Sequence, residues 1–277
     1  MENNENLIDI DRVIASKNPT LLKLIPGFVI RYMKRIVHQD GINDYIYRNR
    51  EKIGLAFVDA ILREFGADIR IRDTGYGIRI IKPGGRYIIA ANHPLGGLDG
   101  MALIQAVGRV RPDLVFPVND ILMNVPGLQP LFIPINKHGK NTENVSIIDE
   151  TFASDKVILY FPAGLVSRKQ RGGVIRDLEW KKTFITKARK YRRDVIPVYI
   201  SGRNSDFFYN LANWRKRLGI KANLEMLYLV DEMVKQKDKP IRLTFGEPIP
   251  YITFDKSKTD TQWAAWVKER VYSLKDV

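Results

Sequence analysis

Two residues with acid–base chemistry, His93 and Asp99, stand where a strand-like run gives way to a glycine-rich turn. Residues 86–91 are largely apolar, and the glycines after His93 permit a sharp turn into the next helix. In sheets of parallel strands, active-site residues usually lie in the loops that follow the carboxyl ends of the strands. A carboxylate beside one imidazole nitrogen fixes the tautomer, leaves the other nitrogen free to accept a proton and stabilises the imidazolium. We therefore predict that His93 is a general base and that Asp99 orients it.

The same pair also has a purely structural interpretation. In that interpretation His93 forms a hydrogen bond inside the turn, and Asp99 is an ordinary N-cap of the following helix. For an isolated histidine and aspartate this is the commoner case, because short motifs produce many false positives. The rest of the sequence has to decide between the two.

The composition narrows the class of protein. The 277 residues are 45% hydrophobic and 27% charged, which suits a globular chain with one main domain and an appendage. The formal net charge of +14 indicates a polyanionic partner. Nucleic acid, anionic lipid headgroups and an acidic carrier protein are the three alternatives. Cysteine is absent, which excludes thiolate nucleophiles and sulfur metal sites. The three histidines show no ligand spacing, so we expect no bound metal and no bound cofactor.

The N-terminal region has the pattern of amphipathic helices. Residues 18–37 place Leu, Ile, Phe and Met on one helical face and Lys and Arg on the other. Such a helix suits the interface of an anionic membrane, although a helix packed on the core with a solvated cationic face shows the same periodicity. A second helical pattern covers residues 43–65 and stops at Gly66. We predict an N-terminal helical hairpin over residues 1–66 that is a candidate for the membrane interface, with neither a signal peptide nor a spanning helix.

From residue 67 onward, strand-like runs alternate with helical patterns. Strands are expected at 86–91, 114–118, 131–135, 156–161, 195–200 and 241–245, and helices at 99–105, 144–152, 178–191, 207–217, 223–234 and 261–274. This alternation predicts an α/β domain over residues 67–277, with a mostly parallel sheet flanked by helices.

Four blocks of this domain resemble the glycerolipid (lysophospholipid) acyltransferase superfamily. Asn92-His93 followed by Asp99 resembles its NHxxxxD block. LFIPINK at 131–137 resembles its second, FIxR-like strand, and FPAGLVSRK at 161–169 resembles FPEGTRS. DVIPVYISG at 194–202 resembles the VIPV block. Four blocks in the family's order are far more specific than any one of them.

The resemblance implies a bacterial peripheral membrane O-acyltransferase on the cytoplasmic face of the inner membrane. Such an enzyme moves a fatty acyl chain from an acyl thioester, borne by acyl carrier protein or coenzyme A, to a hydroxyl group. The acceptor would be a lysolipid, an amino-acid lyso-lipid or lysophosphatidic acid. His93 would deprotonate that hydroxyl, and direct attack by the alkoxide needs no protein nucleophile. A chain without cysteine and without a GxSxG motif agrees with this mechanism.

The resemblance also assigns residues to substrate binding. They are Asn136, Lys137, Phe161, Pro162, Ala163, Gly164, Ser167 and Arg168. An arginine in the third block is suited to hold a carboxylate or phosphate through two hydrogen bonds. Candidate donors to the oxyanion are the backbone N–H groups around Gly96, Gly97, Ala163 and Gly164.

The sequence departs from the family pattern at three places. Five residues separate His93 from Asp99 where the family has four, so the loop must bulge by one residue for the pair to meet. Ala163 stands where glutamate is usual, and Asn136 with Lys137 stands where arginine is expected; those family positions are linked with a glycerol-phosphate acceptor. The departures weigh against phosphatidic acid synthesis. The N-terminal stretch IDIDRVIASKNP and the FPAG of the third block are more similar to the bacterial hemolysin-like branch, to which O-acylation of lyso-forms of ornithine or glycine lipids is ascribed.

Two other functions stay open. A basic nucleic-acid-binding protein would account for the net charge and for KKTF and NWRKR, but it gives His93 no role. A membrane-surface protein without catalysis would account for the extra loop residue and for Ala163. We predict acyl transfer, with a lysolipid acceptor, an acyl thioester and an anionic membrane surface as partners and no nucleic acid.

Overall fold

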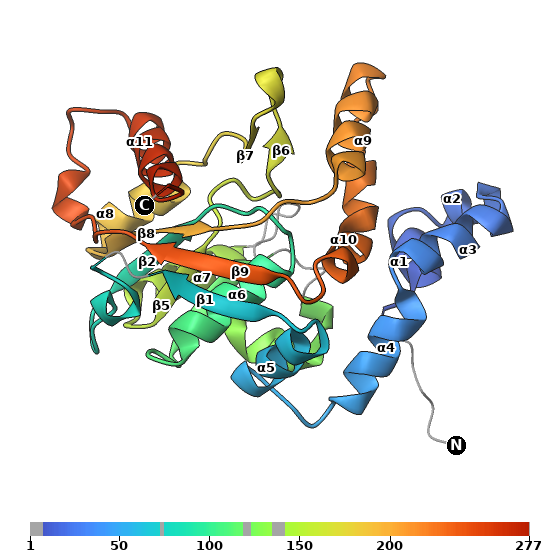
Figure 1. Cartoon of the computed structure of the whole chain (residues 1–277), viewed down its shortest axis with the longest axis horizontal. Helices are drawn as coiled ribbons and strands as arrows, with labels where there is room; N and C mark the ends of the chain where they lie inside the picture. Colours follow the sequence, from blue (N-terminus) through green and yellow to red (C-terminus); the bar gives the residue numbers. More distant parts are fainter. Residues whose placement is uncertain (1–7, 73–74, 119–122, 135–141, 277) are drawn as a thin grey trace.

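The computed structural model describes residues 8–72, 75–118, 123–134 and 142–276, and a seven-stranded sheet runs through the centre of this part (Figure 1). Its strands lie in the order β1-β9-β8-β2-β5-β3-β4. Their bounds are β1 Asp68–Arg72, β2 Tyr87–Ala91, β3 Leu114–Val118, β4 Phe132–Pro134, β5 Val157–Tyr160, β8 Asp194–Ile200 and β9 Pro240–Phe245. The neighbours β8 and β9 are antiparallel, and the other described pairs are parallel. The predicted α/β class with a mostly parallel sheet is confirmed.

Helices cover both faces of this sheet. One face packs on α5 (Leu55–Glu64) and α6 (Leu98–Gly108), and the other packs on α7 (Thr142–Ala153), α8 (Thr183–Tyr191) and α11 (Asp260–Ser273). Strand β2 is buried along its whole length, with alternate residues in the cores of the two faces. A strand covered on both faces must be apolar throughout, which is why its sequence reads as a continuous apolar run.

The N-terminal region consists of short helices. They are α1 (Ile10–Lys17), α2 (Pro19–Leu24), α3 (Gly27–Ile36) and α4 (Gln39–Arg48), followed by α5. The predicted hairpin of two long helices is therefore wrong in its helix lengths. Pro26 caps α3 and separates it from α2, and Gly54, with a φ of 58°, separates α4 from α5. Within the described residues no helix is long and apolar enough to cross a bilayer. That residues 1–66 form a domain of their own stays a prediction.

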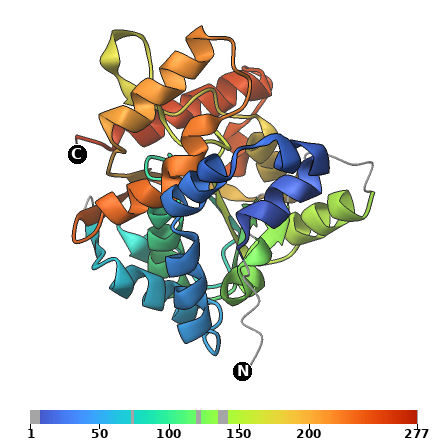
Figure 2. The same ribbon diagram turned by 90° about the vertical axis from the view of Figure 1, so that its right-hand side faces the viewer.

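The N-terminal helices lie against α10 (Leu229–Lys235), as Figure 2 shows. The hydroxyl oxygens of Tyr32 and Tyr228 lie 3.0 Å apart, and Nε2 of His38 lies 3.3 Å from Oδ1 of Asp231. Helix α10 follows α9 (Asp206–Arg217), and a small hairpin of β6 (Arg168–Lys169) and β7 (Ile175–Arg176) lies beside α9. This group of helices borders the carboxyl end of β2.

Candidate active site

His93 leaves the carboxyl end of β2 and meets Asp99 in the first turn of α6. Nδ1 of His93 lies 2.9 Å from Oδ2 of Asp99. The same Oδ2 accepts the N–H groups of Leu95 and Gly96, at 2.8 and 3.2 Å, and Oδ1 accepts the N–H group of Gly100 at 2.8 Å. The carboxylate is fully buried. The structure thus brings the predicted pair together despite the extra residue between them.

The glycines of the loop make this close approach possible. Gly96 has a φ of 95°, in the left-handed region that favours glycine. Helix α10 lies directly over the loop, so that a β-carbon at Gly96 would come within 2.9 Å of Leu229. At Gly97 a β-carbon would overlap the thioether of Met233. The loop can bulge here because neither position carries a side chain.

The electrostatics of the pair favour a charged Asp99 and a basic His93. Burial by itself would raise the pKa of Asp99, but the charge and hydrogen bond of His93 and the backbone N–H donors outweigh it and hold that pKa below its usual range. Burial by itself would lower the pKa of His93, but the charge and hydrogen bond of Asp99 outweigh it and raise that pKa above its usual range. The imidazole is therefore a stronger base than a free histidine.

The His93 ring is also fixed by stacking. Its centroid lies 4.1 Å from that of Phe161 with an interplanar angle of 20°, and Phe161 meets the edge of Phe116 at 5.0 Å. The side chain of His93 is 14% exposed, and no described residue hydrogen-bonds to its Nε2. With Nδ1 on Asp99, Nε2 is the nitrogen free to accept a proton.

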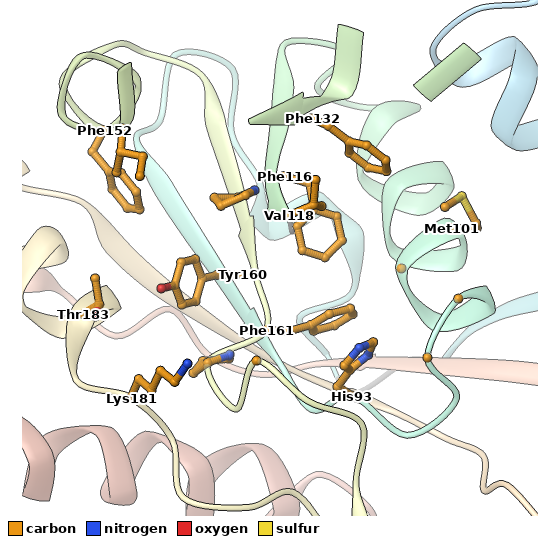
Figure 3. Close-up of a pocket in the computed structure, with 17 residues that line it drawn as sticks. His93, Met101, Phe116, Val118, Phe132, Phe152, Tyr160, Phe161, Lys181 and Thr183 are labelled. Carbon is orange, nitrogen blue, oxygen red and sulfur yellow. The ribbon is translucent and has the colours of Figure 1, made fainter. Parts of the chain in front are cut away.

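A mostly apolar cavity of about 340 Å³ opens beside His93 (Figure 3). Its apolar lining includes Met101, Phe116, Val118, Phe132, Phe152 and Phe161. The polar side chains on its described wall are those of His93, Tyr160, Lys181 and Thr183. A mostly apolar cavity with a few polar groups suits a ligand that has an alkyl chain and a small polar end.

Only some of the substrate-binding residues that the sequence predicted lie on the cavity wall. Phe161, Pro162 and Gly164 line the cavity, whereas Ala163, Ser167 and Arg168 are buried and lie off its wall. Asn136 and Lys137 lie outside the described residues. The third block therefore reaches the cavity only through its first residues.

Arg168 and Ser167 have structural contacts instead. Nη2 of Arg168 donates to the fully buried carboxylate of Glu225 at 2.8 Å, and Nη1 donates to the carbonyl oxygen of Val166 at 2.5 Å. The hydroxyl of Ser167 donates to Oδ1 of Asp177 at 2.5 Å. These polar groups are paired with other protein groups and fix the loop, so a contact of Arg168 and Ser167 with substrate stays a prediction.

Asp177 is a buried acid behind His93 to which the sequence gave no role. Its Oδ1 accepts the backbone N–H of His93 at 3.2 Å, and its Oδ2 accepts the indole N–H of Trp180 at 2.9 Å. The N–H of Ser167 donates to the carbonyl oxygen of His93 at 2.7 Å. Asp177 and Ser167 thereby join the third block to the backbone of the histidine loop. The pattern RDLEW carries no signal for this, because the partner lies 84 residues away.

Asn92, beside the histidine, also has a role that the sequence left unassigned. Its amide Nδ2 donates to the carbonyl oxygen of Ile200 at 2.9 Å, and its Oδ1 accepts the N–H of Ile200 at 2.7 Å. The side chain is almost completely buried. Asn92 therefore ties the carboxyl end of β2 to the carboxyl end of β8 at the base of the site.

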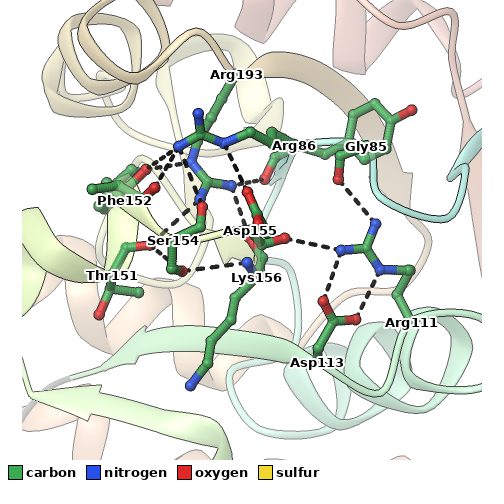
Figure 4. A network of polar contacts seen from close by, with 12 residues as sticks. Gly85, Arg86, Arg111, Asp113, Thr151, Phe152, Ser154, Asp155, Lys156 and Arg193 are labelled. Carbon is green, nitrogen blue, oxygen red and sulfur yellow. Dashed lines mark hydrogen bonds and ion pairs between the residues drawn. The ribbon is translucent and has the colours of Figure 1, made fainter.

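The amino ends of the same strands are held by an arginine network (Figure 4). Arg193, fully buried just before β8, donates to the carbonyl oxygens of Phe152 and Lys156 at 2.7 Å each. Arg86, just before β2, donates to the carbonyl oxygen of Ala153 at 2.6 Å. A helix leaves its last carbonyls without partners, and these arginines satisfy those at the end of α7. The strands are thus fastened at the edge of the sheet opposite His93.

The burial of Arg193 has an electrostatic consequence. Its hydrogen bonds go to carbonyl oxygens rather than to a carboxylate, as Figure 4 shows. Burial, reinforced by the positive charge of Arg86, lowers the pKa of Arg193 to about 10. The guanidinium is still charged at neutral pH, so the network persists under ordinary conditions.

Comparison with known proteins places this geometry in a family. A family model described as an acyltransferase matches residues 12–277. Over 270 residues the chain is 50% identical to a lyso-glycine lipid O-acyltransferase of Bacteroides thetaiotaomicron, with 97% of each chain covered. It is 48% identical over 270 residues to a lyso-glycine lipid O-acyltransferase of Phocaeicola vulgatus, with 97% of this chain and 95% of that one covered.

A solved structure is also similar. It is that of the 1-acyl-sn-glycerophosphate acyltransferase PlsC from Thermotoga maritima, with a TM-score of 0.48, 18% identity and coverage of 90% of this chain and 94% of that chain. The family match over nearly the whole chain and the two relatives at about half identity carry the assignment. The chain belongs to this acyltransferase family, and the protein is an acyltransferase.

Proposed function

We propose that this acyltransferase moves a fatty acyl chain from an acyl thioester to the hydroxyl of a lyso-glycine lipid at a membrane surface. The observation that carries the proposal is the His93–Asp99 pair, 2.9 Å apart, at the wall of an apolar cavity. The choice of acceptor is supported by the two relatives, both named lyso-glycine lipid O-acyltransferases. The absence of the family's glutamate at Ala163 agrees with an acceptor other than a glycerol phosphate.

In the proposed reaction His93 is the general base. Nε2 takes the proton of the acceptor hydroxyl while the hydroxyl oxygen attacks the thioester carbonyl carbon. Asp99, on Nδ1, stabilises the imidazolium that forms. Collapse of the tetrahedral intermediate makes the ester and breaks the carbon–sulfur bond, and the proton on Nε2 passes to the leaving thiolate. The raised pKa of His93 favours the first proton transfer.

The oxyanion of the intermediate needs a hydrogen-bond donor near His93. The N–H of Gly96 already donates to Asp99, and the N–H of Gly164 donates to the carbonyl oxygen of Phe161 at 3.0 Å. The N–H groups of Gly97 and Ala163 have no acceptor among the described residues, but only Gly97 of the two lines the cavity. Gly97 is therefore the donor that we assign to the oxyanion.

Membrane contact is proposed from two exposed surfaces that combine apolar and basic residues. On α2 and α3, Leu24 and Phe28 are 73% and 66% exposed, and on α9 and its C-cap Trp214 and Leu218 are 67% and 73% exposed. Exposed lysines and arginines lie beside both surfaces, and the whole chain has a net charge of +14. Apolar side chains flanked by cations suit the interface of an anionic bilayer. The same positive charge would attract an acidic acyl carrier protein or coenzyme A as donor.

The test is acylation in vitro with the purified protein. A lyso-glycine lipid is incubated with acyl carrier protein or coenzyme A thioesters, and the product is measured by mass spectrometry, with lysophosphatidic acid as the alternative acceptor. We expect His93→Ala to lower the rate by about a hundredfold or more, because the base is lost. His38→Ala is the matched control, since that histidine contacts α10 away from the cavity. A wild-type protein inactive on the lyso-glycine lipid, or full activity of the His93 variant, would overturn the proposal.

A further inference from the structure

Lys181 is a cation on the cavity wall for which the proposed mechanism has no use. Figure 3 shows Lys181 and Thr183 at one end of the cavity and His93 at the other. Among the described residues that line the cavity, Lys181 provides the only ammonium group. Within the described part of the chain its Nζ has neither a carboxylate partner nor a hydrogen-bond acceptor. Lys181 is exposed, so its ammonium is accessible from solvent and available to an anionic ligand that enters the cavity.

The position of Lys181 is set by the same loop that carries the third block. Its backbone N–H donates to the carbonyl oxygen of Pro162 at 3.0 Å, and the preceding Trp180 is buried and bonded to Asp177. Nζ lies over Gly164, where an added β-carbon would come within 3.2 Å of it. The backbone is thus anchored while the ammonium stays at the cavity, an arrangement suited to a binding residue.

We infer that Lys181 binds the carboxylate of the acceptor's glycine headgroup and so selects that acceptor; the inference rests on the proposed function. A glycine joined to a lipid through its nitrogen keeps a free carboxylate, which is ionised at neutral pH. An ammonium provides the point charge and the donors for such a group, and the Thr183 hydroxyl provides a further donor beside it. A carboxylate held at this end leaves the rest of the acceptor to extend along the apolar wall toward His93.

Lys181 could instead bind a phosphate group of the thioester donor. If it binds the acceptor's carboxylate, its loss changes the kinetics of the acceptor; if it binds the donor's phosphate, its loss raises the KM for the thioester. A third role, stabilisation of the oxyanion, would lower the rate for every acceptor alike. Kinetics with an acceptor that has no negative charge distinguish all three.

The experiment compares a lyso-glycine lipid with its methyl ester in wild type and Lys181→Met. We expect wild type to prefer the acid in kcat/KM by about tenfold, because a hydrogen bond to a charged group is worth about that ratio. Lys181→Met should lose this preference, with kcat/KM for the acid lowered and that for the ester unchanged. The KM for the thioester should stay as in wild type. Lys182→Met is the matched control, an exposed lysine one residue away that does not line the cavity.

Three results would overturn the inference. They are a preserved preference for the acid in Lys181→Met, an equal loss for acid and ester, and a raised KM for the thioester alone. Thermal melting of the variant shows that a loss is not due to unfolding; because Lys181 is exposed, we expect no change in Tm. A wild-type protein inactive on both acceptors would instead refute the proposed function itself.

Discussion

His93 and Asp99 could be predicted as a pair because they lie close together in the sequence. An apolar, strand-like run precedes the histidine, and a glycine-rich turn separates it from the aspartate. Asn92, Asp177 and Lys181 could not be predicted in this way. Each gains its role from a partner or a cavity wall formed by residues far along the chain, such as Ile200 for Asn92. The same holds for the ion pair of Arg168, whose partner Glu225 lies 57 residues away and could not be identified from the third block.

The pH dependence of acyl transfer is the prediction that belongs to this pair. The base must be neutral, and the pKa of His93 is raised above 6.5, so kcat/KM should rise with pH through a midpoint above 6.5 and then level off. In Asp99→Asn the charge that raises this pKa is gone while burial, which lowers it, remains. The midpoint should therefore move to lower pH, with a plateau lowered by about a hundredfold or more. A pH–rate profile of both proteins checks this, and an unmoved midpoint in the variant would contradict it.

At the scale of elements, most of the expected strands and helices lie close to the observed ones. Buried parallel strands leave a strong signal because both faces must be apolar, and β3 and β8 agree closely with the expected runs at 114–118 and 195–200. The expected helix at 178–191 begins only at Thr183, because the preceding segment holds Asp177 and Trp180 under the site instead of continuing the helical turn. Periodicity alone does not show such a tertiary contact.

The arginine network makes a prediction about stability. Arg193→Met removes the donors to several buried carbonyl oxygens, and leaving such groups unsatisfied costs about 3 kcal/mol or more in the free energy of unfolding. Arg189→Met is the matched control: that arginine is nearly half exposed and paired with Asp260, so its loss should cost about 1 kcal/mol or less. Urea unfolding of the three proteins measures the difference. Equal midpoints for both variants would show that the network contributes nothing.

At the scale of the whole molecule, the family assignment favours acyl transfer over the nucleic-acid-binding alternative. The contact of His93 with Asp99 shows that the extra loop residue, which had suggested a protein without catalysis, does not separate the pair. Net charge alone could not choose among polyanions, because it carries no geometry. The structure adds geometry by placing Leu24 and Phe28 on α2 and α3, and Trp214 and Leu218 on α9 and its C-cap, among the most exposed large apolar side chains of the described residues.

Membrane contact can be measured through one side chain. The chain has four tryptophans, of which Trp214 is 67% exposed while Trp180 and Trp263 are buried. Vesicles containing phosphatidylglycerol should shift the tryptophan emission to shorter wavelengths, and added salt should weaken the shift by screening. Trp214→Phe should abolish most of the shift, and Trp266→Phe, on α11, should retain it. An unchanged spectrum of the wild type with vesicles, or an undiminished shift in Trp214→Phe, would contradict contact through α9.

The left-handed backbone of Gly96 has a consequence for sequence motifs that fix the number of residues between the histidine and the aspartate. A fingerprint that demands four intervening residues between the base and its acid would pass over this chain, although the two side chains touch. The proposed chemistry requires a contact rather than a fixed spacing, and here a glycine beneath a covering helix accommodates the added residue. Remote relatives are better sought by a histidine after a buried strand, a pair of glycines and a nearby aspartate at flexible spacing.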